Sequence, residues 1–304
     1  MSKNAINSTV LVVGATGFLG MEICRQLVNA GKNVKALVRP GSDSAKVKTL
    51  KQLGVETREG DLKNPNSIRK AIGDIDAVIS TASSTLSRQD GDSIETVDDK
   101  GQLNLVQAAK DGGIEQFIFI SFCPFNLQFP LQTAKRKVEK MLMESKLNYT
   151  ILQSGFFMEL WLSPAVGFDF PNSKVTIYGE GNNKLCWISL ADVAAVVVAS
   201  LDNQAARNTV FQLGGPEAMS PLEVVRIFEN HTGNRFAVDY VPLTVLQSQK
   251  DSATDSLAES FAALMIAYAE GDHIDMTETR KVYPFRLTSV ADYVQRLPVG
   301  HETN

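Results

Sequence analysis

Several features that mark other classes of protein are scarce or absent in this sequence. The three cysteines, Cys24, Cys123 and Cys186, and the three histidines are scattered, without the spacing of metal ligands or of a disulfide framework. No apolar run reaches the roughly 18 residues that span a bilayer. The net charge of −4 argues against binding to nucleic acid through its phosphates. We therefore expect reduced structural thiols, no metal site, no membrane span and no nucleic acid partner.

The beginning of the chain lacks a targeting pattern as well. Residues 1–8 show no apolar core of a secretion signal. Together with the unpaired cysteines, this favours a cytoplasmic protein. The chain has 304 residues, of which 44% are hydrophobic and 21% charged, and this composition suits one large domain or two modest domains with a sizeable core.

The most informative stretch is an apolar run that leads into a glycine-rich turn and a helical pattern. Residues 10–13 read as a buried parallel strand, and Gly14, Gly17 and Gly20 follow it. Glycine there permits a tight turn, close approach of the backbone to a pyrophosphate, and close packing of helix on strand. An ordinary glycine-rich loop is the alternative. We predict a dinucleotide site on the positive end of the helix, formed by Gly14, Thr16, Gly17, Phe18, Leu19 and Gly20.

The end of the second expected strand, residues 33–38, bears on the choice of cofactor. Proteins that bind NAD usually place an acidic residue there to accept hydrogen bonds from the ribose 2′-hydroxyl. Here Arg39 follows the strand, and Lys46 lies a few residues further on. A guanidinium pairs well with a 2′-phosphate, so we predict that NADPH is preferred over NADH. A solvated arginine at a strand end is the alternative.

Strand and helix patterns alternate along much of the chain. Strands are expected at residues 33–38, 54–59, 76–82, 116–121, 148–153 and 210–213, and helices at residues 45–53, 65–72, 98–111, 133–145 and 192–199. This alternation predicts right-handed βαβ units and a doubly wound parallel sheet of the α/β class. A capped helix is expected to begin at residues 220–223, and the polar residues 247–255 suggest a mobile loop.

Several segments follow one another as they do in one known family. They are residues 14–20 (GATGFLG), Val38 with Arg39, residues 60–62 (GDL), residues 117–121 (FIFIS), Lys135 with Val138 and Glu139, residues 149–152 (YTIL), residues 155–158 (GFFM), and Ser189 with residues 192–194 (DVA). With them the chain resembles the NmrA-like and isoflavone-reductase-like group of atypical short-chain dehydrogenases/reductases over nearly its whole length. The resemblance implies a Rossmann sheet with a smaller C-terminal α+β substrate lobe.

The resemblance also implies where the cofactor and the two domains lie. The dinucleotide-binding domain would comprise residues 1–155 plus 188–214, and the substrate lobe residues 156–187 plus 215–304. Asp61 and Leu62 would flank the adenine. Thr81, Ala82 and Ser83 would line the ribose side, and Gly155 and Phe156 would border the nicotinamide.

The catalytic residues of this superfamily are only partly present. A tyrosine usually stands four residues before a lysine on one helix face and donates a proton to the substrate. With Lys135 in the lysine position, Leu131 occupies the tyrosine position and cannot transfer a proton. In the isoflavone-reductase-like branch, the resemblance implies that a lone lysine serves as general acid or base. We therefore take Lys135 and Ser121 as the catalytic candidates.

Other readings of these and of neighbouring residues stay open. Lys135 could bind only the ribose, or belong to a solvated basic run at residues 135–137. Cys123 is expected to be a buried thiol, and Asp192 to cap the helix that it begins. The aromatic residues at positions 122, 125, 129, 156, 157 and 161 could line an apolar pocket or belong to the core.

These observations favour an NADPH-dependent reductase that transfers hydride to an apolar or aromatic carbonyl, enone or quinone. A reduced quinone oxygen can take its proton from water, which suits the missing tyrosine. The alternative is a non-catalytic NADP(H)-binding redox sensor or assembly factor that acts through a protein partner, and a homodimer is compatible with either. Sugar-nucleotide epimerisation is less favoured because that chemistry depends on the tyrosine.

Overall fold

The structure is a computed structural model that describes residues 8–298. The chain divides into two compact units. The first comprises residues 1–122, 130–153 and 193–211, and the second comprises residues 123–129, 154–192 and 212–304. The assignment of a dinucleotide to residues 1–155 plus 188–214, and of a substrate to the remaining residues, stays a prediction.

A seven-stranded sheet with the order β11-β6-β5-β4-β1-β2-β3 forms the centre of the first unit. Its strands are β1 (Thr9–Val13), β2 (Asn33–Val38), β3 (Glu56–Glu59), β4 (Ala77–Ser80), β5 (Gln116–Phe122), β6 (Asn148–Ser154) and β11 (Thr209–Leu213). β1 pairs in parallel with both β2 and β4, so the direction of winding reverses between β1 and β4. The predicted doubly wound parallel sheet is thus confirmed, and ligands of such sheets bind at the carboxyl edge beside this reversal.

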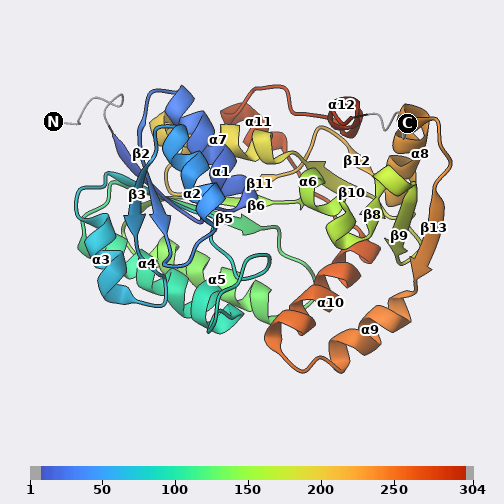
Figure 1. Ribbon diagram of the computed structural model, residues 1–304, viewed down its shortest axis with the longest axis horizontal. Coiled ribbons are helices and arrows are strands. Elements are labelled where there is room, and N and C mark those ends of the chain that lie inside the picture. Colours follow the sequence, from blue (N-terminus) through green and yellow to red (C-terminus); the bar gives the residue numbers. More distant parts are fainter. Residues whose placement is uncertain (1–7, 299–304) are drawn as a thin grey trace. The chain divides into compact units, whose positions relative to one another are not determined.

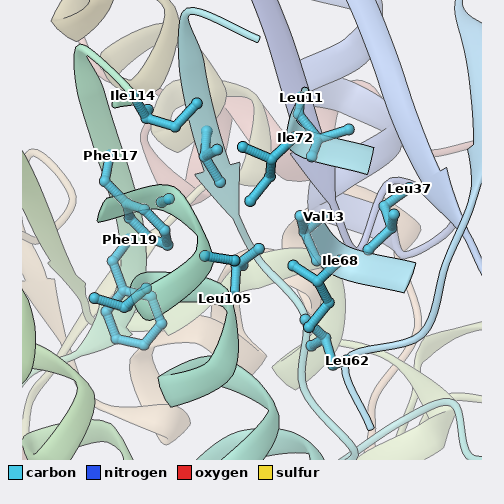
Figure 2. Close-up of a cluster of buried hydrophobic side chains, with 14 of the residues drawn as sticks. Leu11, Val13, Leu37, Leu62, Ile68, Ile72, Leu105, Ile114, Phe117 and Phe119 are labelled. Atoms are coloured by element: carbon cyan, nitrogen blue, oxygen red, sulfur yellow. The ribbon is translucent and has the colours of Figure 1, made fainter. Parts of the chain in front are cut away.

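Helices cover both faces of this sheet (Figure 1). They are α1 (Phe18–Asn29), α2 (Ser44–Gln52), α3 (Pro65–Ile72), α4 (Lys100–Asp111), α5 (Pro130–Glu144) and α7 (Leu190–Asp202). Alternate strand residues point to opposite faces, so Leu11 and Val13 of β1 both face α3 and α4. There they share one core with Ile68 of α3, Leu105 of α4 and Phe117 of β5, as Figure 2 shows.

The helix expected over residues 98–111 begins earlier and has two parts. A π-helix, η2 (Ile94–Asp99), precedes α4, and Ser93 caps it through a reciprocal capping box with Thr96. The cap explains the earlier start, because it satisfies free N–H groups of the first turn. π-Helical turns are rare and are found mostly at functional sites. This one carries the buried Asp98.

The second unit contains two small three-stranded sheets and several helices. One sheet has the order β12-β10-β7, and the other has the order β13-β9-β8. The strands are β7 (Phe156–Phe157), β8 (Phe168–Asp169), β9 (Lys174–Tyr178), β10 (Leu185–Ile188), β12 (Ala218–Met219) and β13 (Ala237–Val241). The helices are α6 (Met158–Trp161), α8 (Pro221–Thr232), α9 (Leu243–Asp251), α10 (Ser256–Glu270), α11 (Thr277–Val282) and α12 (Val290–Gln295). Short 3₁₀ turns lie at η3 (Pro164–Val166), η4 (Phe170–Asn172) and, in the first unit, η5 (Gln204–Ala206).

Two local predictions for this unit have opposite outcomes. The capped helix start is confirmed, because Ser220 and Glu223 form a capping box at the beginning of α8. The mobile loop over residues 247–255 is wrong, because α9 runs to Asp251 and α10 begins at Ser256. Leu246 is buried and anchors α9, and the carboxylate of Asp255 accepts hydrogen bonds from the first N–H groups of α10.

The described part of the chain has neither a membrane span nor a cluster of metal ligands. None of the helices within residues 8–298 is long and apolar enough to cross a bilayer. The same residues contain no group of three or more His, Cys, Asp and Glu side chains that could hold a metal ion. All three cysteines are buried and outside disulfide bonds, and burial raises the pKa of Cys24 to about 12.

Candidate functional site

The glycine-rich turn brings β1, α1 and the end of β4 so close that side chains are excluded. Gly14 has φ +88°, and a Cβ atom there would lie 2.6 Å from Thr81 Oγ1 and 2.7 Å from the backbone nitrogen of Ala82. A Cβ atom on Gly20 would lie only 2.1 Å from the Gly14 carbonyl oxygen, and one on Gly17 would lie 3.2 Å from it. Gly14 and Gly20 therefore have the turn and packing roles that the sequence predicts for them, whereas the approach of a pyrophosphate to Gly17 stays a prediction.

The beginning of α1 is suited to an anion. Gly17 is its N-cap residue and has no side chain to cap the free N–H groups, and the first turn contains no acidic residue. Phe18 is 69% exposed, whereas Leu19 is buried and anchors the helix. N–H groups that lack partners at a helix start, together with the helix dipole, bind phosphate groups. The turn and helix thus fit the pyrophosphate of a dinucleotide.

Arg39, at the end of β2, is held in an ionic cluster. Its Nη1 donates to Oδ2 of Asp92, and Lys63 Nζ donates to Oδ1 of the same carboxylate. Lys63 Nζ also lies 3.6 Å from Asp61 Oδ2. Arg39 is therefore paired within the chain. This differs from both expectations, a guanidinium available to a phosphate and a solvated side chain. The sequence reasoning missed Lys63 and Asp92, because no local pattern relates residues so far apart in the chain.

A further cation lies beside the glycine turn. Lys46 Nζ is placed 5.7 Å from the centroid of the exposed Phe18 ring. Lys46 lies near the start of α2, whose N-cap is Asp43. The carboxylate of Asp43 accepts hydrogen bonds from the N–H groups of Ala45 and Lys46, so this helix start already has an anion.

The adenine candidates Asp61 and Leu62 follow β3. The N–H group of Asp61 donates to Ser67 Oγ at 3.0 Å, and its Oδ1 accepts from the Lys63 N–H group at 2.8 Å. Leu62 is buried and faces Gly101, where a Cβ atom would lie 2.9 Å from Leu62 Cβ. These bonds fix the backbone after β3 at the carboxyl edge of the sheet.

The ribose candidates Thr81, Ala82 and Ser83 follow β4 at the same edge. Thr81 Oγ1 donates to the last carbonyl of β1 at 3.3 Å. The carbonyl of Ala82 accepts a 2.8 Å hydrogen bond from Nε2 of the buried Gln102. All three residues are half-buried. The glycine turn, Arg39, Asp61 and this segment thus lie at the carboxyl ends of neighbouring strands of one sheet.

Lys135, on α5, is buried in the first unit. Its Nζ donates to the carbonyl oxygen of Ile120 at 3.3 Å and lies 4.9 Å from the centroid of the Phe119 ring. Burial lowers the pKa of Lys135, although the charges of Asp98 and Glu139 act in the opposite direction. The alternative of a solvated basic run is therefore wrong for Lys135. A buried amine whose pKa is lowered is suited to proton transfer.

Ser121 follows Ile120, the carbonyl partner of Lys135, along β5, and its hydroxyl has a cationic partner. Its Oγ accepts a 3.0 Å hydrogen bond from Arg136 Nη2, which also donates to the carbonyl oxygen of Phe122 at 2.5 Å. Because the Ser121 oxygen accepts from Arg136, its hydroxyl hydrogen can be donated to another oxygen. Leu131 is buried four residues before Lys135 on α5, so an alkyl group occupies the position of the usual phenol.

Asp98 is a further candidate that the sequence reasoning did not single out. It is buried in the π-helix η2, and its Oδ2 accepts hydrogen bonds from Ser84 N–H at 2.9 Å and from Ser84 Oγ at 2.6 Å. Its Oδ1 makes no hydrogen bond. Its charge acts on Lys135. The irregular helix positions this carboxylate, and no sequence period indicates a π-turn.

Gly155 and Phe156, the nicotinamide candidates, belong to the second unit. The N–H group of Gly155 donates to the carbonyl oxygen of Leu213 at 2.8 Å, and a Cβ atom there would lie 2.5 Å from the Cys186 carbonyl oxygen. The Phe156 ring is buried, with its centroid 4.8 Å from that of Trp161. Of the aromatic residues whose role was left open, these two belong to the core of this unit. Their contact with a nicotinamide stays a prediction.

The structure also tests the expectations for Cys123 and Asp192. Cys123 is a buried thiol, as expected. Asp192 does not cap a helix, because α7 begins at Leu190 and the carboxylate accepts hydrogen bonds from Thr288 N–H and Oγ1 instead. The N–H group of Leu190 donates to Glu159 Oε2 at 2.9 Å and that of Ala191 donates to Ser189 Oγ at 3.1 Å, so a carboxylate distant in the sequence and the preceding serine share the cap.

The NmrA-like family matches residues 6–294. The chain belongs to this family. It is 30% identical over 297 residues to the photosystem II assembly factor Ycf39 of Synechocystis, covering 94% of this chain and 89% of that protein. It is 31% identical over 260 residues to the NAD(P)H azoreductase of Xenophilus azovorans, covering 84% of each chain.

A likeness to solved structures extends over the whole fold. The NADPH-dependent quinone oxidoreductase of Escherichia coli, solved with NADPH, superposes with a TM-score of 0.75 at 21% identity, covering 94% of this chain and 98% of that one. At this identity the likeness concerns the fold alone. The relatives named above therefore include both a nucleotide-dependent reductase and an assembly factor.

Proposed function

We propose that the protein is an NADPH-dependent reductase that transfers hydride to an apolar carbonyl, enone or quinone. The observation that carries this proposal is the joint presence, in one unit, of an uncapped glycine-lined helix start and the buried Lys135. The similarity to an NAD(P)H azoreductase supports a nucleotide-dependent reduction, although of another substrate class. A cytoplasmic location and a homodimeric state stay predictions.

The cofactor would be held at the carboxyl edge of the seven-stranded sheet. The glycine turn and the start of α1 bind the pyrophosphate, and Arg39 binds the 2′-phosphate, so that NADPH is preferred. Asp61 and Leu62 flank the adenine, and the segment from Thr81 to Ser83 lines the ribose. Gly155 and Phe156 border the nicotinamide. When bound, the cofactor supplies the hydride.

Lys135 and Ser121 are the polar side chains that we assign to the reacting end. Lys135 holds a ribose hydroxyl and, as an ammonium with a lowered pKa, gives a proton to the reduced substrate oxygen. Ser121, which accepts from Arg136, donates its own hydrogen to that oxygen. Because Leu131 cannot supply a proton, substrates whose reduced oxygen is weakly basic are favoured, and quinones are of this kind.

The test is NADPH oxidation by the purified protein against a panel of quinones, enones and simple ketones. We expect quinones to be reduced fastest. Lys135→Met is compared with Lys137→Met, a neighbour on the same helix whose ammonium pairs with Asp99 at the surface. Oxidation at the background rate with every acceptor would overturn the proposal, and so would equal activity of the Lys135→Met variant and the wild type with ketones and enones.

A second candidate is a redox sensor or assembly factor that binds NADP(H) and acts through a protein partner. Leu131 in the position of the proton donor and the similarity to the assembly factor Ycf39 favour it. Tight binding of both NADPH and NADP⁺ without turnover, with a protein captured in only one redox state, would support this candidate. Turnover that is lost in Lys135→Met while the fold is kept would contradict it.

A further inference from the structure

A buried carboxylate lies between the cations that the structure offers to a 2′-phosphate. The side chain of Asp92 is 0% exposed and accepts from Arg39 on one oxygen and from Lys63 on the other. The N–H group of Gln89 donates to it at 2.8 Å. Asp92 follows β4 and precedes η2, so the segment between these elements supplies the central anion of the cluster.

The formal charges of the cluster are balanced, because two cations face two carboxylates. Burial alone would raise the pKa of Asp92, but hydrogen bonds from Lys63, Gln89 and Arg39 outweigh it and lower the pKa, so the carboxylate is ionised near neutral pH. Arg39 and Lys63 therefore share the negative charge of Asp92. Asp61, whose Oδ2 lies 3.6 Å from Lys63 Nζ, adds a second negative charge, so the four groups carry a formal net charge of 0. The Arg39 and Lys63 side chains remain 24% and 25% exposed, so both can still reach a ligand.

We propose that Asp92 sets the cofactor selectivity, because its carboxylate competes with a 2′-phosphate for Arg39 and Lys63. Lys63 is then a second cation for the 2′-phosphate, beside Arg39. The protein binds NADPH only a few-fold more tightly than NADH, because part of the attraction for the phosphate is already used within the chain. This inference rests on the proposed function only in taking the ligand to be a nicotinamide dinucleotide.

The charge balance gives the inference a sharp test. Asp92→Asn keeps the shape and an acceptor oxygen for Arg39, and raises the net charge of the cluster to +1. Lys63→Met lowers the net charge to −1, and the double variant returns it to 0. Dissociation constants for NADPH and NADH are measured by fluorescence titration at low ionic strength, where charge effects are least screened.

The expected pattern comes from the Coulomb attraction between the phosphate and the cluster. NADPH should bind about tenfold more tightly to Asp92→Asn and about tenfold more weakly to Lys63→Met, because one unit charge within several ångströms changes the energy by one to a few kcal/mol. NADPH binding to the double variant should return close to that of the wild type. The dissociation constant of NADH should change less than twofold in all three variants. Asp90→Asn is the matched control, because it removes an equal charge from an exposed side chain of the same segment.

Other patterns would overturn the inference. Weaker NADPH binding by Asp92→Asn would make the carboxylate a support for Arg39 and not a competitor. Equal changes in the dissociation constants of NADPH and NADH would exclude a role at the 2′-phosphate. An unchanged dissociation constant of NADPH in Lys63→Met would exclude Lys63 as a ligand. If Asp92→Asn does not fold, Lys63→Met alone still decides whether Lys63 is a ligand. Failure of the proposed function is distinguishable, because the wild type would then bind neither dinucleotide or would bind both without turnover.

Discussion

At the residue scale, Lys135 decides which chemistry the site can perform. Its ammonium is buried, bonded to one carbonyl oxygen and placed against the face of an aromatic ring. Burial lowers its pKa, while two buried carboxylates, Asp98 and Glu139, keep the charged form accessible. An amine in this environment can either hold a ribose hydroxyl or give up a proton, and the two roles have different kinetic consequences.

With a ketone or enone acceptor, we expect Lys135→Met to lower the turnover number at saturating NADPH by about 100-fold, because a positioned proton donor contributes at least that factor. With a ketone or enone acceptor, the wild-type rate should fall as pH rises through a pKa below the usual value for lysine, because the ammonium is then lost. Lys135→Arg should show no such fall. If Lys135 only binds ribose, Lys135→Met will weaken NADPH binding and leave the turnover number unchanged.

Arg39 gives a second prediction at this scale. Arg39→Asp should weaken NADPH binding by at least about tenfold, because it removes a guanidinium partner of the 2′-phosphate and adds a repelling charge. NADH binding should change little, since it lacks that phosphate. Titration of both cofactors measures the difference, and equal losses for NADPH and NADH would contradict a role at the 2′-phosphate.

At the element scale, the contact between β1 and α1 depends on glycine. The backbone carbonyl of Gly14 lies where a side chain on Gly20 would have to be, and a backbone atom cannot turn aside as a flexible side chain can. Because α1 also packs on β2, its displacement would move the helix start that we assign to the pyrophosphate.

Gly20→Ala should therefore destabilise the protein by about 2 kcal/mol or more, as overpacking of a tight contact does. It should also weaken the binding of both NADPH and NADH. Gly73→Ala is the control, because its nearest neighbouring atom, the carbonyl oxygen of Lys70, is 3.8 Å from the added Cβ atom. Urea unfolding and cofactor titration of both variants measure the effects. Wild-type stability in Gly20→Ala would show that the contact can relax.

The strands, turns and helices also differ in how far the sequence could predict them. Strands such as residues 10–13 and the glycine turn were predictable, because buried runs and special backbone angles leave local signals. The π-turn that carries Asp98 has no such signal, and α9 was missed because its residues 247–251 are mostly polar. The pairing of Arg39 with Asp92 joins different segments of the fold, so only the folded chain could reveal it.

At the scale of the whole molecule, family membership narrows the function without fixing it. The chain matches the NmrA-like family over nearly its full length, and its relatives include a reductase and an assembly factor. A Rossmann sheet supports many activities, so the site must decide between them. Both candidate functions require a bound dinucleotide, and they differ in whether the bound cofactor then gives its hydride to a substrate.

Binding of NADPH should stabilise the whole chain. At a free concentration of about 100 times its dissociation constant, NADPH should add about 2.7 kcal/mol to the free energy of unfolding, because it binds only the folded state. In a protein of this size, that gain should raise Tm by several degrees. Thermal unfolding with and without NADPH tests this, and an unchanged Tm under these conditions would contradict the nucleotide site itself.

The central claim, that this chain is a reductase, is tested most directly by a single-turnover experiment. The purified protein is loaded with one equivalent of NADPH and mixed with a quinone, and the oxidation of the cofactor is followed in time. The account predicts oxidation well above the rate without protein, and a loss of this oxidation in Lys135→Met when a ketone or enone replaces the quinone. NADPH that binds tightly yet stays reduced with quinones, enones and ketones would contradict the account and favour a sensor or assembly factor.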